Sequence, residues 1–357
     1  MKKIKFLVAL VLVISILSGC AGTAVVYYSD CTCPADSHEP QVNVQPENTN
    51  TTPAAEGALK TGLAIIASAE GSVSAEAGKA GQAKYDVTVA AVLVDENGII
   101  VDCLIDSIGT SVNFDDNGYI DAAAIPEVLT KDQLGENYGM KKAGSDYEWN
   151  EQAAALCEYA IGKTVGELRN GAVGETGKAS DADLASKASI YLGGYVDAIE
   201  AAVNNAAAIG SQAGDELRFA VTASLTDSKS AAEGKNGTAQ LNCDVAVITM
   251  NGEIITGCII DSLQAKVNFD ASGVIGELGQ MLTKNQLGEA YGMKKFGSKY
   301  EWNEQVAYFC EYVTGRTVAQ VSEISVNEQT KPTDADIAST VTIAVGGFIG
   351  LIQKAAQ

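Results

Sequence analysis

Histidine is almost absent from this sequence. The 357 residues include one histidine, His38, which lies in a polar N-terminal segment. A Ser-His-Asp or Cys-His catalytic set is therefore excluded. The chain also has no Cys-x-x-Cys-His haem motif, no histidine-rich metal cluster and no Gly-Lys-Ser/Thr phosphate loop. Redox chemistry, if the protein performs it, must use an organic cofactor.

Positive charge and long apolar runs are also scarce. The 24 Lys and Arg residues face 45 Asp and Glu residues, which gives a formal net charge of −21. Such a chain is repelled by nucleic acid and by anionic lipid, so we expect no nucleic-acid partner. Beyond the first twenty residues, no segment is long and apolar enough to be expected to span a membrane.

The first nineteen residues have the features of a secretory signal. Three lysines (Lys2, Lys3 and Lys5) precede an apolar run over residues 6–17, which is too short for an ordinary spanning helix. Leu17-Ser18-Gly19-Cys20 resembles the lipobox of bacterial lipoproteins. The resemblance implies cleavage before Cys20, lipidation of its thiol and a mature protein anchored on the outer face of a membrane. Loss of the three lysines lowers the formal net charge from −21 to −24.

Residues 20–58 are predicted to be a flexible tether behind the lipidated Cys20. They are rich in Asn, Thr, Pro, Glu and Ala and show no apolar periodicity. A random coil of this length spans roughly 35 Å on average. Cys31 and Cys33 lie here, and no second pair follows at zinc-site spacing, so a local disulfide or two unassigned thiols are both compatible with the pattern.

The remainder of the chain is an internal tandem repeat. Residues 130–142 (TKDQLGENYGMKK) return as residues 283–295 (TKNQLGEAYGMKK), and residues 147–152 (YEWNEQ) return as 300–305, with an offset of 153 in both cases (283 − 130 and 300 − 147). A period this long indicates a duplicated domain. We expect repeats over residues 59–210 and 211–357.

Each repeat is predicted to be α+β, an antiparallel sheet with packed helices. Apolar alternation predicts strands over 85–94 and 99–105, joined by an Asn-Gly turn, and a short strand over 112–114. The corresponding strands of the second repeat are 243–250, 254–260 and 267–269. Helices are expected from Trp149 and from Trp302, near residues 164–168, and at the end of each repeat.

A hydroxyl residue is expected at the start of the last helix of each repeat. These residues are Ser189 and Thr342, each with an aspartate six residues upstream, at Asp183 and Asp336. One interpretation is that the hydroxyls simply cap the helices. The other is that each carries a phosphate-linked cofactor, because free N–H groups at a helix N-terminus favour an anion.

Four cysteines occupy equivalent positions in the two repeats. Cys103 and Cys157 correspond to Cys258 and Cys310, with one of each pair on a strand and one on a helix. Export permits disulfides Cys103–Cys157 and Cys258–Cys310. The alternative is that all four are free thiols packed as small apolar residues.

The stretches around the two hydroxyls resemble the target motif of covalent flavin attachment, Asp-x-x-(Ser/Thr)-Gly-Ala-(Thr/Ser). In that family a flavin transferase joins the phosphate of FMN to the final hydroxyl, which implies phosphoesters of FMN at Thr342 and Ser189. The chain departs from the motif where glycine is replaced by Lys187 and Thr340, and alanine by Val341. The matching residues are Asp183, Ser186, Ala188 and Ser189 in the first repeat, and Asp336, Ser339 and Thr342 in the second.

The repeated loop before the Trp helix has a composition that suits a flavin. Tyr could stack on the ring, Met could pack beside it, and Lys could face phosphate or a reduced ring. The alternative is an ordinary surface loop fixed by Tyr and Met packing. The candidates are Lys131 or Lys141, Tyr138 and Met140 in the first repeat, and Lys284 or Lys294, Tyr291 and Met293 in the second.

As a whole, the two repeats resemble divergent FMN-binding domains, and the layout resembles the flavinylated lipoproteins of Gram-positive extracellular electron transfer. The resemblance implies a monomeric electron carrier, rather than an enzyme with its own substrate, that takes electrons from a membrane quinol or dehydrogenase component. An alternative function is a cofactor-free surface binding protein. Residues 12–19 also resemble the apolar pheromones released from some lipoprotein signals.

Overall fold

The computed structural model describes residues 57–357, and the expectations for the signal, Cys20, Cys31, Cys33 and the tether up to residue 56 lie outside this range. No helix among the described residues is long and apolar enough to cross a membrane. The first repeat contains β1 (Lys60–Ser68), β2 (Gly81–Val94), β3 (Ile100–Phe114), η1 (Ala122–Ala124), α1 (Lys131–Leu134), η2 (Gly135–Tyr138), α2 (Trp149–Ala160), α3 (Val165–Ala172), α4 (Ala182–Lys187) and α5 (Gly193–Asn204).

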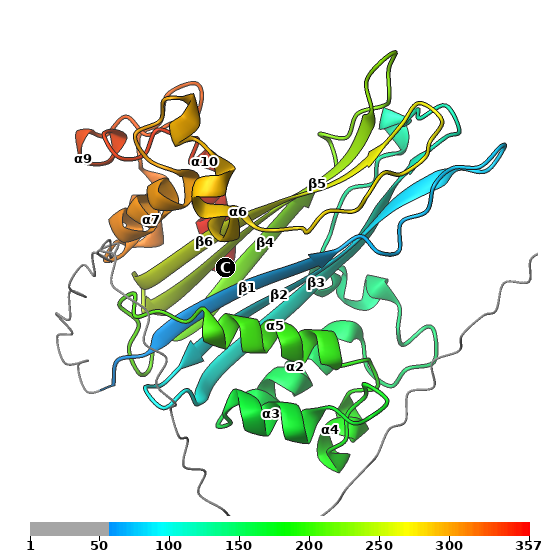
Figure 1. Cartoon of the computed structure of the whole chain (residues 1–357). Coiled ribbons are helices and arrows are strands. Elements are labelled where there is room, and N and C mark those ends of the chain that lie inside the picture. The colour runs from blue at the N-terminus through cyan, green and yellow to red at the C-terminus, as the bar shows by residue number, and fades with distance from the viewer. Residues whose placement is uncertain (1–56) are drawn as a thin grey trace, which may run out of the picture. The chain divides into compact units, whose positions relative to one another are not determined.

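The second repeat follows the same order with small differences. It contains β4 (Glu216–Ser224), β5 (Gly237–Asn251), β6 (Ile254–Phe269), α6 (Lys284–Leu287), η3 (Gly288–Tyr291), η4 (Lys294–Phe296), α7 (Trp302–Val313), α8 (Val318–Ser322), α9 (Ala335–Ala338) and α10 (Gly346–Ala355). The expected boundary between residues 210 and 211 falls in the segment between α5 and β4 (Figure 1).

Each repeat folds its three strands into an antiparallel sheet in the order β1-β2-β3 or β4-β5-β6. Alternate side chains of a strand point to opposite faces of the sheet. On β2, Tyr85, Val87 and Val89 point to one face, whereas Ala90 and Val92 point to the other, and both sets are buried. Each sheet is therefore covered on both faces.

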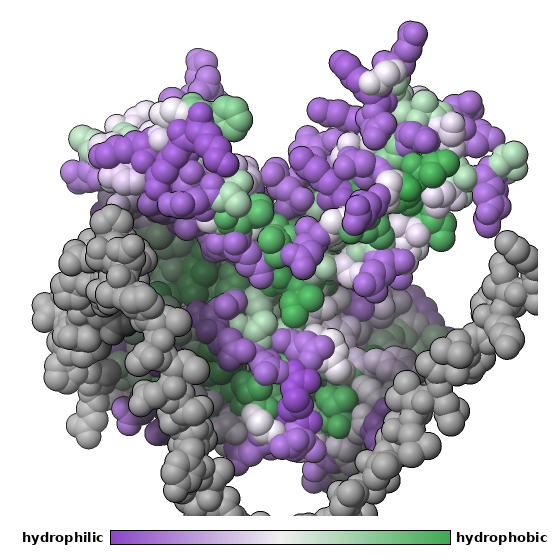
Figure 2. All heavy atoms as spheres, in the orientation of Figure 1, coloured by the Kyte–Doolittle hydropathy of each residue, from purple (hydrophilic) through white to green (hydrophobic). Residues whose placement is uncertain are grey.

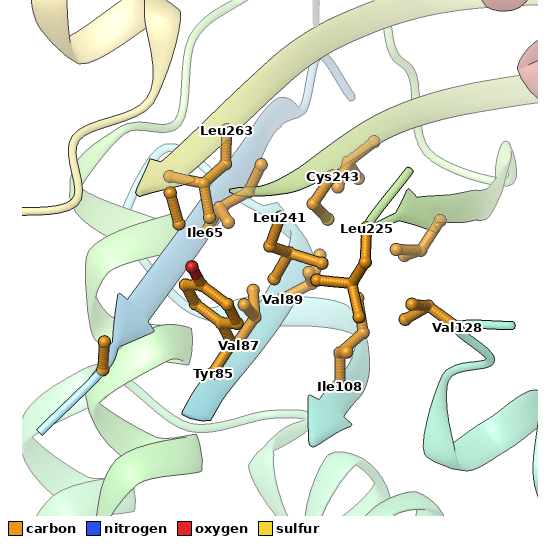
Figure 3. Close-up of a cluster of buried hydrophobic side chains, with 14 of the residues drawn as sticks. Ile65, Tyr85, Val87, Val89, Ile108, Val128, Leu225, Leu241, Cys243 and Leu263 are labelled. Carbon is orange, nitrogen blue, oxygen red and sulfur yellow. The ribbon is translucent and has the colours of Figure 1, made fainter. Parts of the chain in front are cut away.

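The two sheets pack against each other, and the helices cover their outer faces. One buried cluster contains side chains from all six strands, including Ile65, Tyr85, Leu241 and Leu263 (Figure 3). The hydroxyl of Tyr85 donates across this interface to the carbonyl of Ala239 at 2.7 Å. The order of layers is helices, sheet, sheet, helices (Figure 1). The predicted α+β class, with two antiparallel sheets and packed helices, is confirmed.

Reciprocal contacts relate the two repeats by an approximate twofold axis. The rings of Phe114 and Phe269 stack with centroids 4.0 Å apart and planes 3° apart. The amide of Ala75 donates to the carbonyl of Gly273 at 2.8 Å, and the amide of Ala231 donates to the carbonyl of Gly118 at 2.7 Å. Neither sheet is therefore complete without the other, because each buries its inner face on the partner repeat.

The helical layer of each repeat is built on one long helix with a strong N-terminal signal. Glu148 and Glu301 form capping boxes with Glu151 and Glu304 at the starts of α2 and α7. The apolar stripe of α2 then packs on the outer face of β3, and α7 packs equally on β6. In Figure 2 the outer surface is mostly hydrophilic, and hydrophobic residues are exposed in the hollow between the helices of the two repeats.

The strand prediction was wrong in two respects. The expected strands 99–105 and 112–114 are one continuous strand, β3, and β6 likewise joins 254–260 to 267–269. The polar residues between them belong to the strand: Asp106 is buried and accepts hydrogen bonds from the amides of Ser107 (2.7 Å) and Asp132 (3.2 Å). The first strand of each repeat, β1 or β4, was not predicted. In β1 residues 61–65 are all buried, so it lacks the alternation of a half-exposed strand.

Candidate functional site

The two candidate hydroxyls lie upstream of the helices that they were expected to begin. Helices α5 and α10 start at Gly193 and Gly346, four residues after Ser189 and Thr342. Their N-cap residues are Leu192 and Val345, and neither makes a side-chain capping bond. The expectation of a hydroxyl at the helix start was therefore wrong, and so was the interpretation of Ser189 and Thr342 as simple helix caps.

A buried glutamine holds each hydroxyl residue in place. The side chain of Gln305 on α7 is 1% exposed. Its Oε1 accepts the backbone N–H of Thr342 at 2.8 Å and the hydroxyl of Thr342 at 3.1 Å. Gln152 on α2 accepts the corresponding groups of Ser189 at 2.7 and 3.3 Å. Both residues are exposed, and the hydrogen bonds to the glutamines fix the orientation of their hydroxyl groups.

The same glutamines connect the hydroxyl residues to the repeated loop. The Nε2 group of Gln152 donates to the hydroxyl of Ser145 (3.1 Å), to the carbonyl of Tyr147 (2.9 Å) and towards the sulfur of Met140 (3.7 Å). In the second repeat, Gln305 makes the equivalent contacts with Ser298, Tyr300 and Met293 at 3.1, 3.0 and 3.9 Å. The predicted methionines therefore lie on the same glutamine as the predicted hydroxyls.

The predicted lysines and tyrosines gather around the buried Trp at the start of α2 or α7. The Nζ atom of Lys131 lies 5.4 Å from the ring centroids of both Tyr138 and Trp149. In the second repeat, Nζ of Lys284 lies 5.4 Å from the ring of Tyr291 and 4.8 Å from that of Trp302. Both Trp side chains are buried in the helical core of their repeat. These distances are within cation–π range.

One substitution makes the two lysine environments different. Tyr195 on α5 receives hydrogen bonds from Nζ of Lys131 (3.3 Å) and from Nε1 of Trp149 (2.9 Å). The equivalent residue on α10 is Phe348, which has no hydroxyl and packs edge-on against Trp302. Burial lowers the pKa of Lys131, but Tyr195 and Tyr138 together raise this pKa above its ordinary value.

In the second repeat, burial lowers the pKa of Lys284 below its ordinary value, and the carboxylates of Asp244 and Asp261 oppose that effect only in part. The charge on Lys284 is thus held less firmly than the charge on Lys131. The lysine that would face a bound anion therefore has a different pKa in each repeat.

The remaining motif residues lie near the hydroxyls without bonding to them. Asp183 and Ser186 are exposed on α4, where the Ser186 hydroxyl donates to the carbonyl of Asp183 at 2.7 Å. Asp336 is in the first turn of α9, and Ser339 is its C-cap. Among the described residues, no hydrogen bond joins any of these four side chains to Ser189 or Thr342.

Two buried carboxylates, which the sequence analysis did not identify, support the lysine-bearing turns. Asp261 on β6 accepts the amides of Ser262 (2.7 Å) and Asn285 (3.1 Å). Burial raises the pKa of Asp261 to about 6, although these amides and the Thr283 hydroxyl oppose the rise. Asp106 plays the same part in the first repeat and also has a pKa of about 6. Only their equivalence between repeats could have drawn attention to them.

The paired cysteines are adjacent in space and are free thiols in the structure. Cys103 and Cys157 share a side-chain hydrogen bond, as do Cys258 and Cys310, and all four are buried. That contact raises the pKa of Cys103 and Cys258 well above the ordinary value, and desolvation adds to the rise. The thiols of each within-repeat pair are therefore in contact, and the bridges stay a prediction.

The described residues contain no group of three or more His, Cys, Asp or Glu side chains that could hold a metal ion. Comparison with known proteins gives no further guide: no family model, no curated protein and no solved structure matches the chain. The functional conclusion therefore depends on the site itself.

Proposed function

We propose that this protein is a lipid-anchored electron carrier that bears FMN covalently at Thr342 and at Ser189. A single observation carries the proposal. Each repeat presents a hydroxyl residue held by a buried glutamine that also contacts a methionine, and a lysine that lies over two aromatic rings, one of them the Trp that begins the helix of that glutamine. The duplication preserves this arrangement in both halves although the surrounding sequence has changed.

The space around the hydroxyls fits a phosphate. Helices α5 and α10 both begin with two glycines, and a Cβ atom built on Gly193, Gly194 or Gly347 would meet no atom within 4 Å. At Gly346, by contrast, a Cβ atom would meet Thr330 at 2.9 Å, so the start of α10 is less open than the start of α5. The unpaired first N–H groups of a helix favour an anion.

The neighbouring side chains fit the ring of a flavin. Tyr138 is 40% exposed and could offer a ring face, while Met140 packs against the helical core. Lys131 and Lys284 would supply positive charge beside it. The flavin would supply the electron transfer, whereas the chain's own residues hold the linkage, shape the pocket and place a cation next to the ring.

The membrane end of the proposal rests on the N-terminal sequence. A lipid on Cys20 would hold the protein at the outer face of the membrane of a Gram-positive-type bacterium, and the tether would let the folded repeats reach a membrane electron donor. A flavin transferase is the other partner that the proposal requires. The final electron acceptor would be extracellular.

Intact mass and absorbance test the flavin proposal. Protein produced with a flavin transferase should carry two FMN increments and stay yellow after denaturation. Thr342→Val should remove one increment, and Thr342→Val with Ser189→Ala should remove both. Thr222→Val and Ser272→Ala, which change exposed hydroxyl residues outside the attachment motif, are matched controls and should still carry both flavins.

Two outcomes would contradict this proposal. A colourless protein from a host with the transferase would favour a cofactor-free binding protein. A doubly substituted protein that still holds acid-stable flavin would show that the attachment is elsewhere. Folding of each variant is checked separately by urea unfolding, so that loss of flavin is not confused with loss of structure.

A further inference from the structure

A groove follows the free edge of β1, where this strand faces the second repeat. Two adjoining cavities of about 460 and 300 Å³ form it, and Ile65 and Gln286 line both of them. Residues 63–70 supply one wall, and residues 278–286 supply most of the other. In Figure 1 the chain between β6 and α6 runs beside β1. Because residues 276–282 belong to no helix or strand, the groove lies between a strand edge and an irregular segment.

The backbone of β1 is unpaired along this edge. Thr61 exchanges two hydrogen bonds with Ala207, both of 3.0 Å, on the side opposite to β2. Every second residue of a strand directs its N–H and C=O to the same edge, so those of Ile65 and Ala67 point the same way as those of Thr61. Within residues 57–357, no hydrogen bond reaches these groups of Ile65 or Ala67. Ala67 is half-buried and lines the groove, so its backbone lies within reach of a ligand.

The equivalent edge of the second repeat is closed. Val221 on β4 corresponds to Ile65 on β1 in the strand register. Its carbonyl accepts hydrogen bonds from Nε2 of Gln133 at 3.1 Å and from Nζ of Lys354 at 3.2 Å. Natural proteins commonly block a free strand edge with charged side chains, lysine above all. The edge of β4 is protected in this way.

Two differences between the repeats leave the edge of β1 without such donors. Ala201 stands where the second repeat has Lys354, at the repeat offset of 153 (354 − 201). Gln286 is the equivalent of Gln133, and its Oε1 accepts the amide of Thr283 at 2.9 Å, but its Nε2 donates to no group within the described residues. Since Gln286 is exposed, its Nε2 can donate to a ligand. The groove therefore offers unused donors and unused acceptors together.

The side chains around the groove favour an apolar ligand that carries positive charge. Ile66, Leu278 and Leu282 are large hydrophobic residues that are 41%, 37% and 39% exposed. Of the described residues, no Lys, Arg or His lines either cavity, whereas Glu70 and Asp261 do. The formal net charge of −21 also repels an acidic ligand and attracts a basic one.

We propose that this groove binds an extended peptide segment of a partner protein, which adds a strand to the free edge of β1. Groups that point to one edge of a strand recur every two residues, about 7 Å apart, so a peptide can meet them in succession and a compact small molecule cannot. Apolar side chains of the peptide pack on Ile66 and Leu278, and a lysine or arginine lies near Glu70. The wall over residues 278–286 obstructs a second sheet, which favours a separate peptide over a second copy of this protein. The proposal is independent of the proposed flavin sites.

Three peptides of equal length test the proposal by calorimetric titration of the mature protein. The peptide KVTVTVK should bind at one saturable site. EVTVTVE reverses the charge, and KVTPTVK replaces a central N–H with proline, so each should bind at least about fivefold more weakly. No saturable binding of KVTVTVK, or equal binding of either of the other two peptides, would overturn the proposal.

Matched proline substitutions locate the binding. The N–H of Ala67 points away from β2, so Ala67→Pro removes an edge donor and keeps the pairing with β2. Ala223→Pro is the equivalent change on β4. Ala67→Pro should weaken the binding of KVTVTVK at least about fivefold, whereas Ala223→Pro should leave it unchanged. Urea unfolding shows whether each variant is folded. Binding that survives in folded Ala67→Pro protein would show that the peptide lies elsewhere.

A second variant closes the edge without altering β1. Ala201→Lys introduces the lysine that covers the edge of β4, and its Nζ should compete for the carbonyl of Ile65. The affinity for KVTVTVK should fall at least about fivefold. Ala154→Lys adds the same charge at an exposed position on α2 and should leave the affinity unchanged. Equal affinities of the Ala201→Lys and Ala154→Lys proteins would contradict the proposal.

Amide hydrogen exchange identifies the occupied edge directly. Saturating KVTVTVK should slow exchange over residues 63–69 and leave the equivalent residues 219–225 unchanged. Equal slowing of both strands, or of neither, would refute the added strand. A dimer that forms without peptide and is lost in Ala67→Pro would show that a second copy occupies the edge, and would also overturn the proposal.

Discussion

Gln305→Met tests whether the buried glutamine is the structural centre of the candidate site. Methionine has a similar length and fills the space, so the change removes hydrogen bonds with little effect on packing. The bonds lost from the glutamine are those with Thr342 N (2.8 Å), Thr342 Oγ1 (3.1 Å), Ser298 Oγ (3.1 Å) and Tyr300 O (3.0 Å). All four connect α7 to segments that are distant along the chain or lie in the preceding loop.

The expected loss of stability follows from what each partner can do afterwards. A protein hydrogen bond contributes about 1 kcal/mol net, and more is lost if a buried partner stays unsatisfied. Thr342 is exposed, so its N–H and hydroxyl can bind water after the change. The Tyr300 carbonyl, by contrast, is part-buried and loses the donor that Gln305 supplied. We therefore expect a decrease of about 2–3 kcal/mol in the free energy of unfolding.

Urea unfolding followed by circular dichroism measures this decrease, with the m-value checked for change. Gln152→Met, the equivalent change in the first repeat, should cost a similar amount. Gln329→Met is the control, because Gln329 is exposed and its side chain makes no hydrogen bond within the described residues; it should change the free energy by less than about 0.5 kcal/mol.

A double-mutant cycle isolates the contact with the acceptor residue. Thr342→Val alone removes the hydroxyl but keeps the backbone N–H bond to Gln305. The coupling energy between Gln305→Met and Thr342→Val should then be about 0.5–1 kcal/mol. If Gln305→Met costs no more than the Gln329 control, the glutamine does not hold this site and the reasoning is refuted.

Two further predictions concern buried ionisable groups. Because burial raises the folded-state pKa of Asp261 to about 6, the folded protein binds more protons than the unfolded chain between about pH 4 and 6. The free energy of unfolding should therefore fall as pH rises through this window, by up to about 3 kcal/mol for this group. Asp261→Asn should flatten the dependence of this free energy, measured by urea unfolding, on pH. An unchanged dependence would contradict the burial argument. For the paired thiols, non-reducing peptide mapping of aerobic protein should link Cys258 to Cys310, and the bridge should contribute about 4 kcal/mol by loop closure. Recovery of both as free thiols would reject it.

Local patterns were sufficient for the parts of the fold that depend on neighbouring residues. The helix beginning at Trp149 follows from its apolar stripe, and it is stabilised by a capping box over four consecutive residues. The hairpin turn at Asn97-Gly98 was predicted from the Asn-Gly pair alone. In the structure Gly98 adopts the positive φ, 77°, that such a turn requires. Neither inference needs a distant partner.

Features that depend on distant partners could not be predicted. Asp106 looks like a strand breaker in the sequence, and only the amide of Asp132, 26 residues away, explains its burial. The continuous apolar run over residues 89–94 of β2 indicates that both faces of the strand are buried there, but it does not say that the partner of one face is a second sheet.

The candidate site shows the same limit. Gln152 stands in the repeated string that marked the duplication, yet its role depends on Ser189, which follows 37 residues later. The helix start was misplaced because the apolar stripe begins at Leu192, a buried residue that ends the preceding loop, whereas the helix itself begins at the following glycine.

The duplication has produced two similar sites in unlike surroundings. Both sites belong to the outer helical layers, so two sheets, packed about 10 Å apart, lie between the layers. In one site the hydroxyl of Tyr195 ties Lys131 to Trp149, and in the other Phe348 leaves Lys284 without that partner. If FMN is attached at both hydroxyls, the negative charge of a reduced ring would be stabilised to a different degree in each repeat, because the nearby cation is held differently. Exchanging Tyr195→Phe and Phe348→Tyr should therefore exchange the order in which the two flavins are reduced.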